Sequence, residues 1–396
     1  MKYQILIVGG GNAGISTAAK LLLKNSKLKI GIIEPSEKHY YQPAWTLVGG
    51  GAYDIADTVR AEADFIPKGA TWIKDAVATF LPEANQLTTL NGETIEYDYL
   101  IVCPGIQLNW NKIDGLAETM GKNDVCSNYS FQYAPYTFEC LKNLEKGTAI
   151  FTAPGTAVKC GGAPQKIMYL AADYIRKAGR ADKVKIEFDS AGSVIFGIEK
   201  YAKTLRKVVE RYQIATNFKH DLIKVDGPAR QATFSVTAPD GTVSEVTKHF
   251  DLLHITPPQS APDFVRNSPL ANEAGWVDVD NFSLQHKKYP NIFSLGDAAG
   301  SPNSKTGAAV RKQAPVVVEN LLAVMAGQTP AAKYNGYSSC PIVTGNGKLM
   351  LAEFGYDNKI METFPFDQSK ERWSMWVLKR YILPWLYWNK ILNGAM

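Results

Sequence analysis

Short apolar runs alternate with glycine-rich turns and amphipathic stretches along much of the chain. At the N-terminus, residues 2–8 predict a buried strand, residues 15–23 predict a helix, and residues 29–33 predict a second strand. The same order recurs where the apolar residues 149–151 precede a predicted helix over residues 166–172. Strands that alternate with helices in this way indicate an α/β fold with parallel sheets.

The turn after the first predicted strand has the spacing of a dinucleotide-binding fingerprint. Gly9, Gly11 and Gly14 satisfy the pattern G-x-G-x-x-G, and Glu34 follows the second strand, 20 positions after Gly14. The first glycine allows the tight turn, the second lets a pyrophosphate approach the backbone, and the third allows close helix packing. An acidic residue at position 34 suits the hydroxyls of an unphosphorylated adenosine ribose, as in FAD or NAD.

Two later stretches resemble the other fingerprints of flavoproteins with two dinucleotide-binding domains. Residues 96–105 predict a strand that ends in Cys-Pro-Gly, where such proteins usually have Ala-Thr-Gly, so Gly105 keeps its place. Residues 289–297 end in Gly296 and Asp297, and in such proteins this aspartate meets the ribityl chain of the flavin. The resemblance implies FAD, bound by a domain that an insertion splits.

We therefore expect two Rossmann-like domains, with the second inserted into the first. The FAD-binding domain takes residues 1–115 and 285–325, the inserted domain takes residues 116–284, and residues 326–396 form a C-terminal region. The inserted domain lacks a glycine fingerprint after its first strand, where the loop instead contains Cys160. This absence argues against NADH as the electron donor, because the phosphates of a nicotinamide dinucleotide bind at that turn.

Cys160 lies in a polar, glycine-rich loop just before a predicted helix, which Pro164 in its first turn supports. The helix N-terminus and the neighbouring Lys159 and Lys166 are expected to lower the pKa of the Cys160 thiol. Cys160 is therefore predicted to be a reactive thiolate and not a packing residue.

Nearly the whole chain resembles the sulfide:quinone oxidoreductase family, in particular the branch that includes the mitochondrial enzymes. The resemblance rests on residues 35–49, 158–166, 336–345 and 363–372. It implies a redox pair, Cys160 and Cys340, whose disulfide is attacked by sulfide to give a persulfide, with two electrons passing through FAD to a membrane quinone. It also implies flavin contacts from Gly10, Glu34, Gln42, Val77, Asp297 and Lys305.

The three remaining cysteines are expected to have no catalytic role. Cys103 ends a predicted strand and Cys140 lies in a helical pattern over residues 136–144, so both are predicted to pack in the core. Cys126 lies near a position where some branches of the family have a third cysteine, but the following Ser-Asn-Tyr-Ser resembles the two-cysteine branch. Neither the five cysteines nor the five dispersed histidines have metal-ligand spacing, so we expect no metal site.

Charge and hydropathy indicate which kinds of macromolecule or membrane the protein can bind. The 396 residues carry a formal net charge of +5, which is too small and scattered to indicate nucleic acid but permits contact with an anionic membrane. No apolar run reaches the length of about 18 residues that predicts a spanning helix. The strand predicted at residues 2–8 leads us to expect no signal peptide.

The C-terminal stretch, residues 371–392, combines aromatic residues with cations: Arg372, Trp373, Trp376, Lys379, Arg380, Tyr381, Trp385, Tyr387, Trp388 and Lys390. It predicts an amphipathic helix pair, interrupted at Pro384, that lies in the headgroup layer of a membrane. The alternative is a helix packed on the body of the protein. We expect a peripheral, monotopic protein of a bacterial or mitochondrial inner membrane, because a lipid-soluble quinone is reached from the bilayer.

Two other functions stay open at this point. A type II NADH:quinone oxidoreductase would share the fold, and a flavin-bound redox or sulfide sensor would share the cysteines without turnover. The sequence also leaves open whether the sulfane sulfur passes to a thiol or to sulfite, and whether the chain forms a homo-oligomer.

Overall fold

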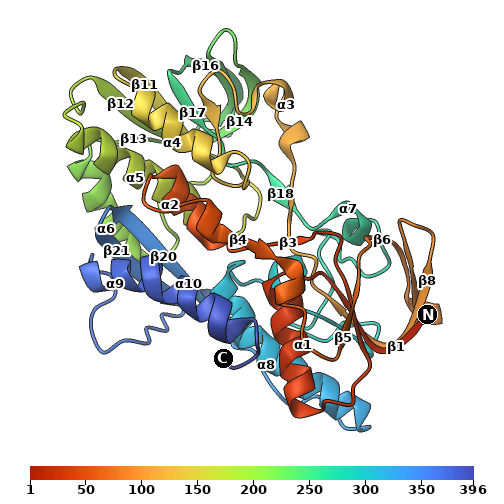
Figure 1. The fold of residues 1–396 in the computed structure, drawn as a ribbon. Helices are drawn as coiled ribbons and strands as arrows, with labels where there is room; N and C mark the ends of the chain where they lie inside the picture. Colours follow the sequence, from red (N-terminus) through yellow and green to blue (C-terminus); the bar gives the residue numbers. More distant parts are fainter.

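A computed structural model describes the whole chain, residues 1–396, and its core is built on two parallel sheets (Figure 1). The first sheet contains β1 (Lys2–Val8), β2 (Ile30–Ile33), β5 (Ala70–Ile73), β6 (Val77–Leu81), β7 (Gln86–Thr89), β8 (Thr94–Val102) and β19 (Ile292–Ser294). The strand order is β5-β2-β1-β8-β7-β6, and β19 pairs with the second half of β8. All neighbours are parallel except β6, β7 and the start of β8, which form an antiparallel extension.

Both faces are buried in the middle of the first sheet, at β1, β2, β19 and the second half of β8, which explains the nearly continuous apolar runs there. Because side chains alternate along a strand, β1 directs Ile5 and Ile7 to one core and Leu6 and Val8 to another. The first core also contains residues of α1 (Asn12–Lys24) and α8 (Gly307–Met325), which lie side by side in Figure 1. The carboxyl ends of β1 and β2 therefore face the start of α1.

The second sheet is formed by residues between β8 and β19. Its five parallel strands, in the order β10-β17-β11-β12-β13, are β10 (Val125–Cys126), β17 (Leu252–His254), β11 (Gly147–Ala153), β12 (Val184–Ser190) and β13 (Ala215–Phe218). One face packs against α4 (Ala134–Asn143), α5 (Ala163–Lys177) and α6 (Glu199–Arg211). The other face packs against an antiparallel sheet of β14 (His220–Asp226), β15 (Gln231–Thr237) and β16 (Val243–His249).

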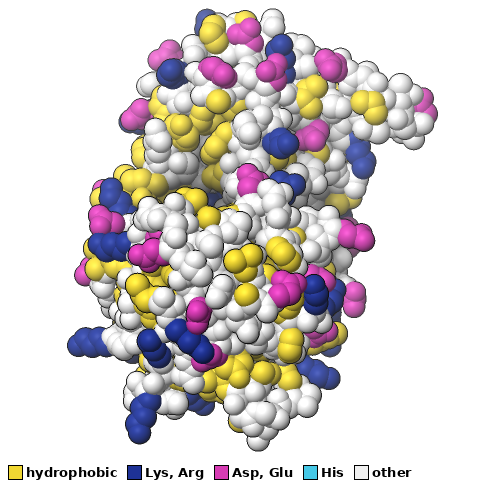
Figure 2. All heavy atoms as spheres, turned by 90° about the vertical axis from the view of Figure 1, so that its right-hand side faces the viewer, with side chains coloured by type: hydrophobic (Ala, Val, Ile, Leu, Met, Phe, Trp, Pro, Cys, Tyr) yellow, Lys and Arg dark blue, Asp and Glu magenta, His cyan; other side chains and the backbone are white.

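The chain passes between the two sheets along neighbouring segments. The outgoing β9 (Gln107–Leu108) pairs with the returning β18 (Gln259–Ser260), so both crossings lie together. Among the remaining short elements, β3 (Lys38–Tyr40) pairs with β4 (Val59–Ala61), and α7 (Asp263–Arg266) packs near β6. By contrast, α2 (Trp45–Gly49) packs against α4 and α5, and α3 (Leu116–Thr119) lies against β14. Figure 2 shows acidic and basic side chains interspersed over one face of the molecule.

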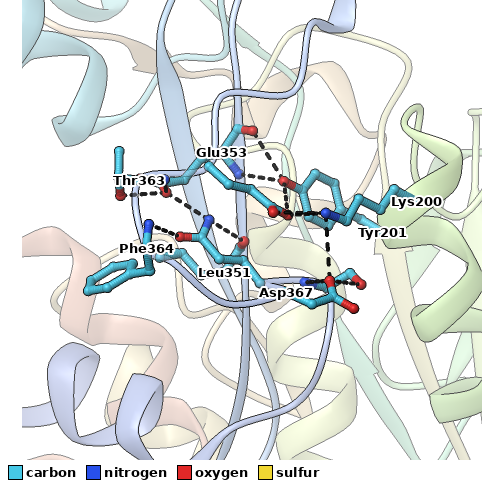
Figure 3. A network of polar contacts seen from close by, with 10 residues as sticks. Lys200, Tyr201, Leu351, Glu353, Thr363, Phe364 and Asp367 are labelled. Atoms are coloured by element: carbon cyan, nitrogen blue, oxygen red, sulfur yellow. Dashed lines mark hydrogen bonds and ion pairs between the residues drawn. The ribbon is translucent and has the colours of Figure 1, made fainter.

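A hairpin after α8, formed by β20 (Ser338–Gly345) and β21 (Lys348–Phe354), packs against α5. The buried carboxylate of Glu353 on β21 holds the following loop to this hairpin (Figure 3). Glu353 Oε2 accepts hydrogen bonds from Thr363 N at 2.8 Å and from Gln368 Nε2 at 2.7 Å. A buried carboxylate needs such donors, so this network fixes the hairpin that carries Cys340.

The C-terminal segment is one continuous helical run and not the helix pair that the sequence predicts. It consists of α9 (Trp373–Val377), a π-helical turn (Leu378–Ile382), α10 (Leu383–Leu386) and a second π-helical turn (Tyr387–Ile391). Pro384 lies in the first turn of α10, directly after the wider π-turn, which accommodates a residue without a backbone N–H. No helix in the structure is long and apolar enough to cross a bilayer.

Candidate active site

The fold brings together Cys160 and Cys340, which are 180 positions apart in the chain. Cys160 lies in the loop between β11 and α5, and Cys340 lies on β20 opposite Ala352. Their Sγ atoms are 3.5 Å apart. Cys160 has a φ of +56°, and its N–H donates to the carbonyl of Lys305 at 2.7 Å, so the loop is held in a defined conformation.

Gly162 makes this approach of the two sulfurs geometrically possible. A Cβ atom at position 162 would lie 2.5 Å from Cys340 Sγ, which is far inside contact distance. By contrast, a Cβ atom at Gly161 would meet no atom within 4 Å. The two adjacent glycines therefore have different roles, and only the second is required for the cysteine pair.

Lys166 controls the charge of the pair. Its ammonium, buried in the first turns of α5, donates to Cys160 Sγ at 2.9 Å. The hydrogen bond with Cys340, together with the charge of Lys166, holds the pKa of Cys160 well below its ordinary value, although burial opposes them. The hydrogen bond with Cys160, together with burial, raises the pKa of Cys340. Cys160 is thus the thiolate of the pair and Cys340 is the thiol.

Lys159 does not act on Cys160 in the way that the sequence predicts. Its Nζ donates to Gln42 Oε1 at 2.6 Å and lies over the ring of Trp45. Burial lowers the pKa of Lys159 to about 8. Of the two lysines, only Lys166 is hydrogen-bonded to the Cys160 sulfur, and Lys159 instead connects the cysteine loop to Gln42.

The glycine turn at the start of α1 has the geometry of a phosphate cradle. Gly9 has a φ of +105°, and a Cβ there would lie 2.4 Å from the carbonyl oxygen of Cys103. A Cβ at Gly14 would lie 1.9 Å from the Gly9 carbonyl, so α1 can approach the strand only with glycine there. A Cβ at Gly11 would meet open space, and no side chain caps α1. The free N–H groups of this helix start suit an anion.

Glu34 lies directly beside this turn. Its Oε2 accepts from Gly10 N and its Oε1 accepts from Ser36 N, both at 2.8 Å, and burial raises its pKa. The other predicted cofactor contacts surround the same region. Val77 is buried in the core with Val8 and Ile33, and Gly105 follows β8 with a φ of +82°.

Asp297 and Lys305 connect the region of the glycine turn to the cysteine loop. Gly296 lies close to Ala13 of α1, and Asp297 follows it. Lys305 Nζ donates to the carbonyl of Asp297 at 2.7 Å, and its own carbonyl accepts from Cys160. Burial lowers the pKa of Lys305 to about 8 and raises the pKa of Asp297. The predicted cofactor residues therefore extend from the glycine turn to the loop that carries Cys160.

Lys379 is a site residue that sequence reasoning missed. The sequence analysis places it among the cations of the headgroup layer, but its side chain is buried and its Nζ donates to the carbonyl of Pro43 at 2.8 Å. Burial, and then the charge of Lys166, lower the pKa of Lys379 to about 7. Its charge acts on Cys160 and Cys340, so it adds to the positive field around the pair. No local pattern distinguishes it from Arg380 or Lys390.

A cavity of about 430 Å³ opens beside the cysteine loop, at the carboxyl ends of β11 and β12. Gly161 and Pro164 line it on one side, and Phe196 and Lys305 contribute to other parts of its wall. The cavity gives a small solute a path to the loop that carries Cys160. Cys126 and Cys140 lie apart from it in the core, and burial raises the pKa of the Cys126 thiol.

Comparison with known proteins supplies the family. Residues 3–138 match the family model described as pyridine nucleotide-disulphide oxidoreductase. The chain is 48% identical to the mitochondrial sulfide:quinone oxidoreductase of Dictyostelium discoideum, covering 99% of this chain and 86% of that protein. It is 45% identical to the mitochondrial sulfide:quinone oxidoreductase of Mus musculus, covering 99% and 87%. The X-ray structure of the sulfide:quinone oxidoreductase from Aquifex aeolicus superimposes with a TM-score of 0.82 at 20% identity, covering 99% and 92%.

Proposed function

Because the chain belongs to the sulfide:quinone oxidoreductase family, we propose that it oxidises sulfide at Cys160 and Cys340 and passes two electrons to a membrane quinone. The observation that carries this proposal is the cysteine pair itself. Two sulfurs at 3.5 Å, one of them beside a buried ammonium, are arranged to form and break a disulfide.

The different environments of the two sulfurs support a different role for each. In the oxidised pair, sulfide attacks the sulfur of Cys340, the disulfide bond breaks, and Cys160 leaves as a thiolate. Cys160 is the better leaving group because Lys166 and Lys379 stabilise its negative charge. Cys340 then carries the persulfide, and a thiol or sulfite removes the outer sulfur. Loss of two electrons from the two thiolates re-forms the disulfide.

The cofactor is FAD, held by the residues that the sequence analysis predicts. Family membership implies a flavin, and the uncapped start of α1 with Glu34 beside it supports a dinucleotide form. A flavin bound here supplies the two-electron acceptor between the cysteines and the quinone. Residues 1–115 and 285–325 form the FAD-binding domain, residues 116–284 form the inserted domain, and residues 326–396 supply Cys340 and the helical segment.

Sulfide oxidation fits the site better than either alternative. An NADH-dependent enzyme would need a phosphate turn after β11, and this position holds the Cys160 loop. A sensor without turnover is disfavoured because the relatives at 48% and 45% identity are named as sulfide:quinone oxidoreductases. The protein acts at a membrane surface, peripherally at the inner membrane, with the exposed face of residues 373–391 as the contact.

Anaerobic addition of sulfide to the purified protein tests the proposal. We expect sulfide to bleach the flavin absorbance and added quinone to restore it over many cycles, with Cys103→Ser as a matched cysteine control that keeps this behaviour. Flavin that NADH reduces and sulfide does not would replace the proposal with the NADH-dependent alternative. Reduction by sulfide without steady-state quinone turnover would favour the sensor.

A further inference from the structure

A buried chain of polar side chains runs from the C-terminal helical segment to the glycine turn. Tyr387 lies within hydrogen-bond distance of His39 Nε2, at 2.7 Å, and His39 Nδ1 lies 2.8 Å from Glu62 Oε2. All three residues are more than nine-tenths buried, with exposures of 3% for His39, 1% for Glu62 and 7% for Tyr387. The rings of Phe65 and Trp388 enclose the histidine.

The order of donors along this chain follows from its two ends. A carboxylate only accepts, so His39 Nδ1 carries a proton and donates to Glu62. Burial raises the pKa of Tyr387 well above its ordinary value, so its hydroxyl stays protonated and donates to His39 Nε2. Each group in the chain is thereby satisfied except one, the second carboxylate oxygen of Glu62.

That remaining oxygen, Glu62 Oε1, is buried and has no hydrogen-bond partner. It lies against the glycine turn, since a Cβ at Gly10 would come within 2.5 Å of Glu62 Oε1 and 2.6 Å of Glu34 Cγ. Glu34, the other carboxylate at this point, already accepts from two backbone N–H groups. A buried carboxylate oxygen requires a hydrogen-bond donor, and no group of the protein donates to Glu62 Oε1.

We propose that Glu62 is a second acceptor for the ribose hydroxyls of the cofactor's adenosine, with His39 and Tyr387 as its positioning residues. The inference rests on the proposed FAD. The adenosine ribose has two hydroxyl donors, and two carboxylates that converge on Gly10 match them in number and in chemistry. As a consequence, cofactor binding stabilises the docking of the C-terminal helical segment through Tyr387.

Binding of ADP to the full-length chain, stripped of flavin, tests Glu62 without measuring activity. Calorimetry compares ADP with 2′,3′-dideoxy-ADP, which lacks both hydroxyls. We expect the wild type to prefer ADP, and we expect Glu62→Met to reduce this preference by about tenfold, the scale of a hydrogen bond to a charged group. Glu37→Met is the matched control, because Glu37 is exposed and pairs with Lys74. An unchanged preference in Glu62→Met would overturn the proposal.

Tyr387→Phe gives a second test if Glu62→Met does not fold. This substitution removes the hydroxyl that donates to His39. It should reduce the preference for ADP over 2′,3′-dideoxy-ADP by a smaller factor than Glu62→Met does. Hydrogen exchange should also slow at residues 387–391 when the wild type binds FAD, and this protection should be lost in Tyr387→Phe. Equal exchange with and without FAD would overturn the coupling. A wild type that binds neither FAD nor ADP would instead contradict the proposed cofactor.

Discussion

The ammonium of Lys166 lies 2.9 Å from the sulfur of Cys160. By contrast, Lys159, which directly precedes Cys160 in the chain, donates a hydrogen bond from its ammonium to Gln42. The sequence predicts the same effect on the Cys160 thiol for both lysines, but only Lys166 contacts its sulfur. An opposite charge at such a distance lowers a thiol pKa because it stabilises the thiolate. The two lysines therefore provide a substitution, in the first turns of α5, and its control, in the loop before that helix.

Lys166→Met should raise the pKa of Cys160, because it removes the adjacent positive charge that stabilises the thiolate. The measurement is the rate of alkylation of the reduced protein by iodoacetamide as a function of pH. Because the thiolate is the reactive form, the midpoint of this profile should move to higher pH. Lys159→Met should leave the midpoint close to that of the wild type, and an equal shift in both variants would contradict the assignment.

Gly162→Ala should separate the two sulfurs without touching either. Its new Cβ would lie 2.5 Å from Cys340 Sγ, so β20 or the loop must move. We expect slow formation of the disulfide on mild oxidation and slow turnover with sulfide, with the flavin still bound. Titration of free thiols follows the disulfide directly. Gly161→Ala introduces the same methyl group into open space and should behave like the wild type.

Cys160→Ser and Cys340→Ser should each reduce sulfide-dependent quinone turnover by at least about a thousandfold, since a covalent nucleophile or its partner is lost. Both variants should still bind the flavin, because neither sulfur lies in the glycine turn. Cys140→Ser replaces a buried core cysteine and should lower the melting temperature more than the turnover number. Wild-type turnover in both pair variants would mean that the chemistry occurs elsewhere.

The sequence predicts those parts of the site whose residues are close together in the chain. The strand predicted at residues 2–8 and the helix predicted at residues 15–23 follow from periodicity and spacing, and the structure has a strand at Lys2–Val8 and a helix at Asn12–Lys24. The pairing of Cys160 with Cys340 does not follow from spacing, because 180 residues separate them. It came from the family resemblance, and the structure supplies the distance.

Other features depend on tertiary packing and could not be read from the sequence. Lys379 resembles its neighbours Arg380 and Lys390, but the π-turn rotates it into the protein. Nothing in the local sequence distinguishes Glu62 and His39 from other polar residues. They are brought together by the pairing of β3 with β4, and Tyr387 contacts His39 from the C-terminal segment. In each case a side chain gains its role from an element distant in the chain, which no local pattern encodes.

Glu371 should contribute to stability at neutral pH and lose that contribution in acid. Burial alone would raise its pKa, but the two hydrogen bonds from Arg211, at 2.6 and 2.7 Å, and one from Thr344 outweigh burial and lower it. The folded state therefore binds the proton less readily than the unfolded state, whose carboxyl has a pKa of about 4.3. The stabilisation is complete above that value and disappears as the pH falls through the lower, folded pKa.

Glu371→Gln should accordingly reduce the free energy of unfolding by about 1–3 kcal/mol at pH 7, the range for a partly buried charged hydrogen bond. Urea unfolding at pH 7, 5 and 3 measures the difference from the wild type, which should stay the same between pH 7 and 5 and shrink below about pH 4.3. Glu199→Gln, on an exposed pair with Arg206, should change stability little at any pH. If the difference in unfolding free energy between Glu371→Gln and the wild type grew in acid, the folded state would bind the Glu371 proton more tightly than the unfolded state, which contradicts the prediction.

The membrane contact is testable without truncating the C-terminal segment, whose Trp376, Tyr387 and Trp388 belong to the core. Its exposed face is formed instead by Trp373, Tyr381 and Trp385, with exposures of 70%, 59% and 54%. Burial of such aromatic residues in the headgroup region supplies most of the affinity of an interfacial helix, and nearby cations add attraction to anionic lipid.

Replacing Trp373, Tyr381 and Trp385 together with serine should weaken co-sedimentation with anionic liposomes by at least about tenfold. Flavin reduction by sulfide should be unchanged, because these side chains point away from the cysteines, whereas reduction of a long-chain quinone in lipid should fall. The matched control replaces Leu81, Leu90 and Phe282, which lie outside the C-terminal segment and have exposures of 44%, 71% and 49%. If both triple variants sediment like the wild type, the membrane contact lies on another face, and residues 373–391 serve only to cover the site and hold Lys379.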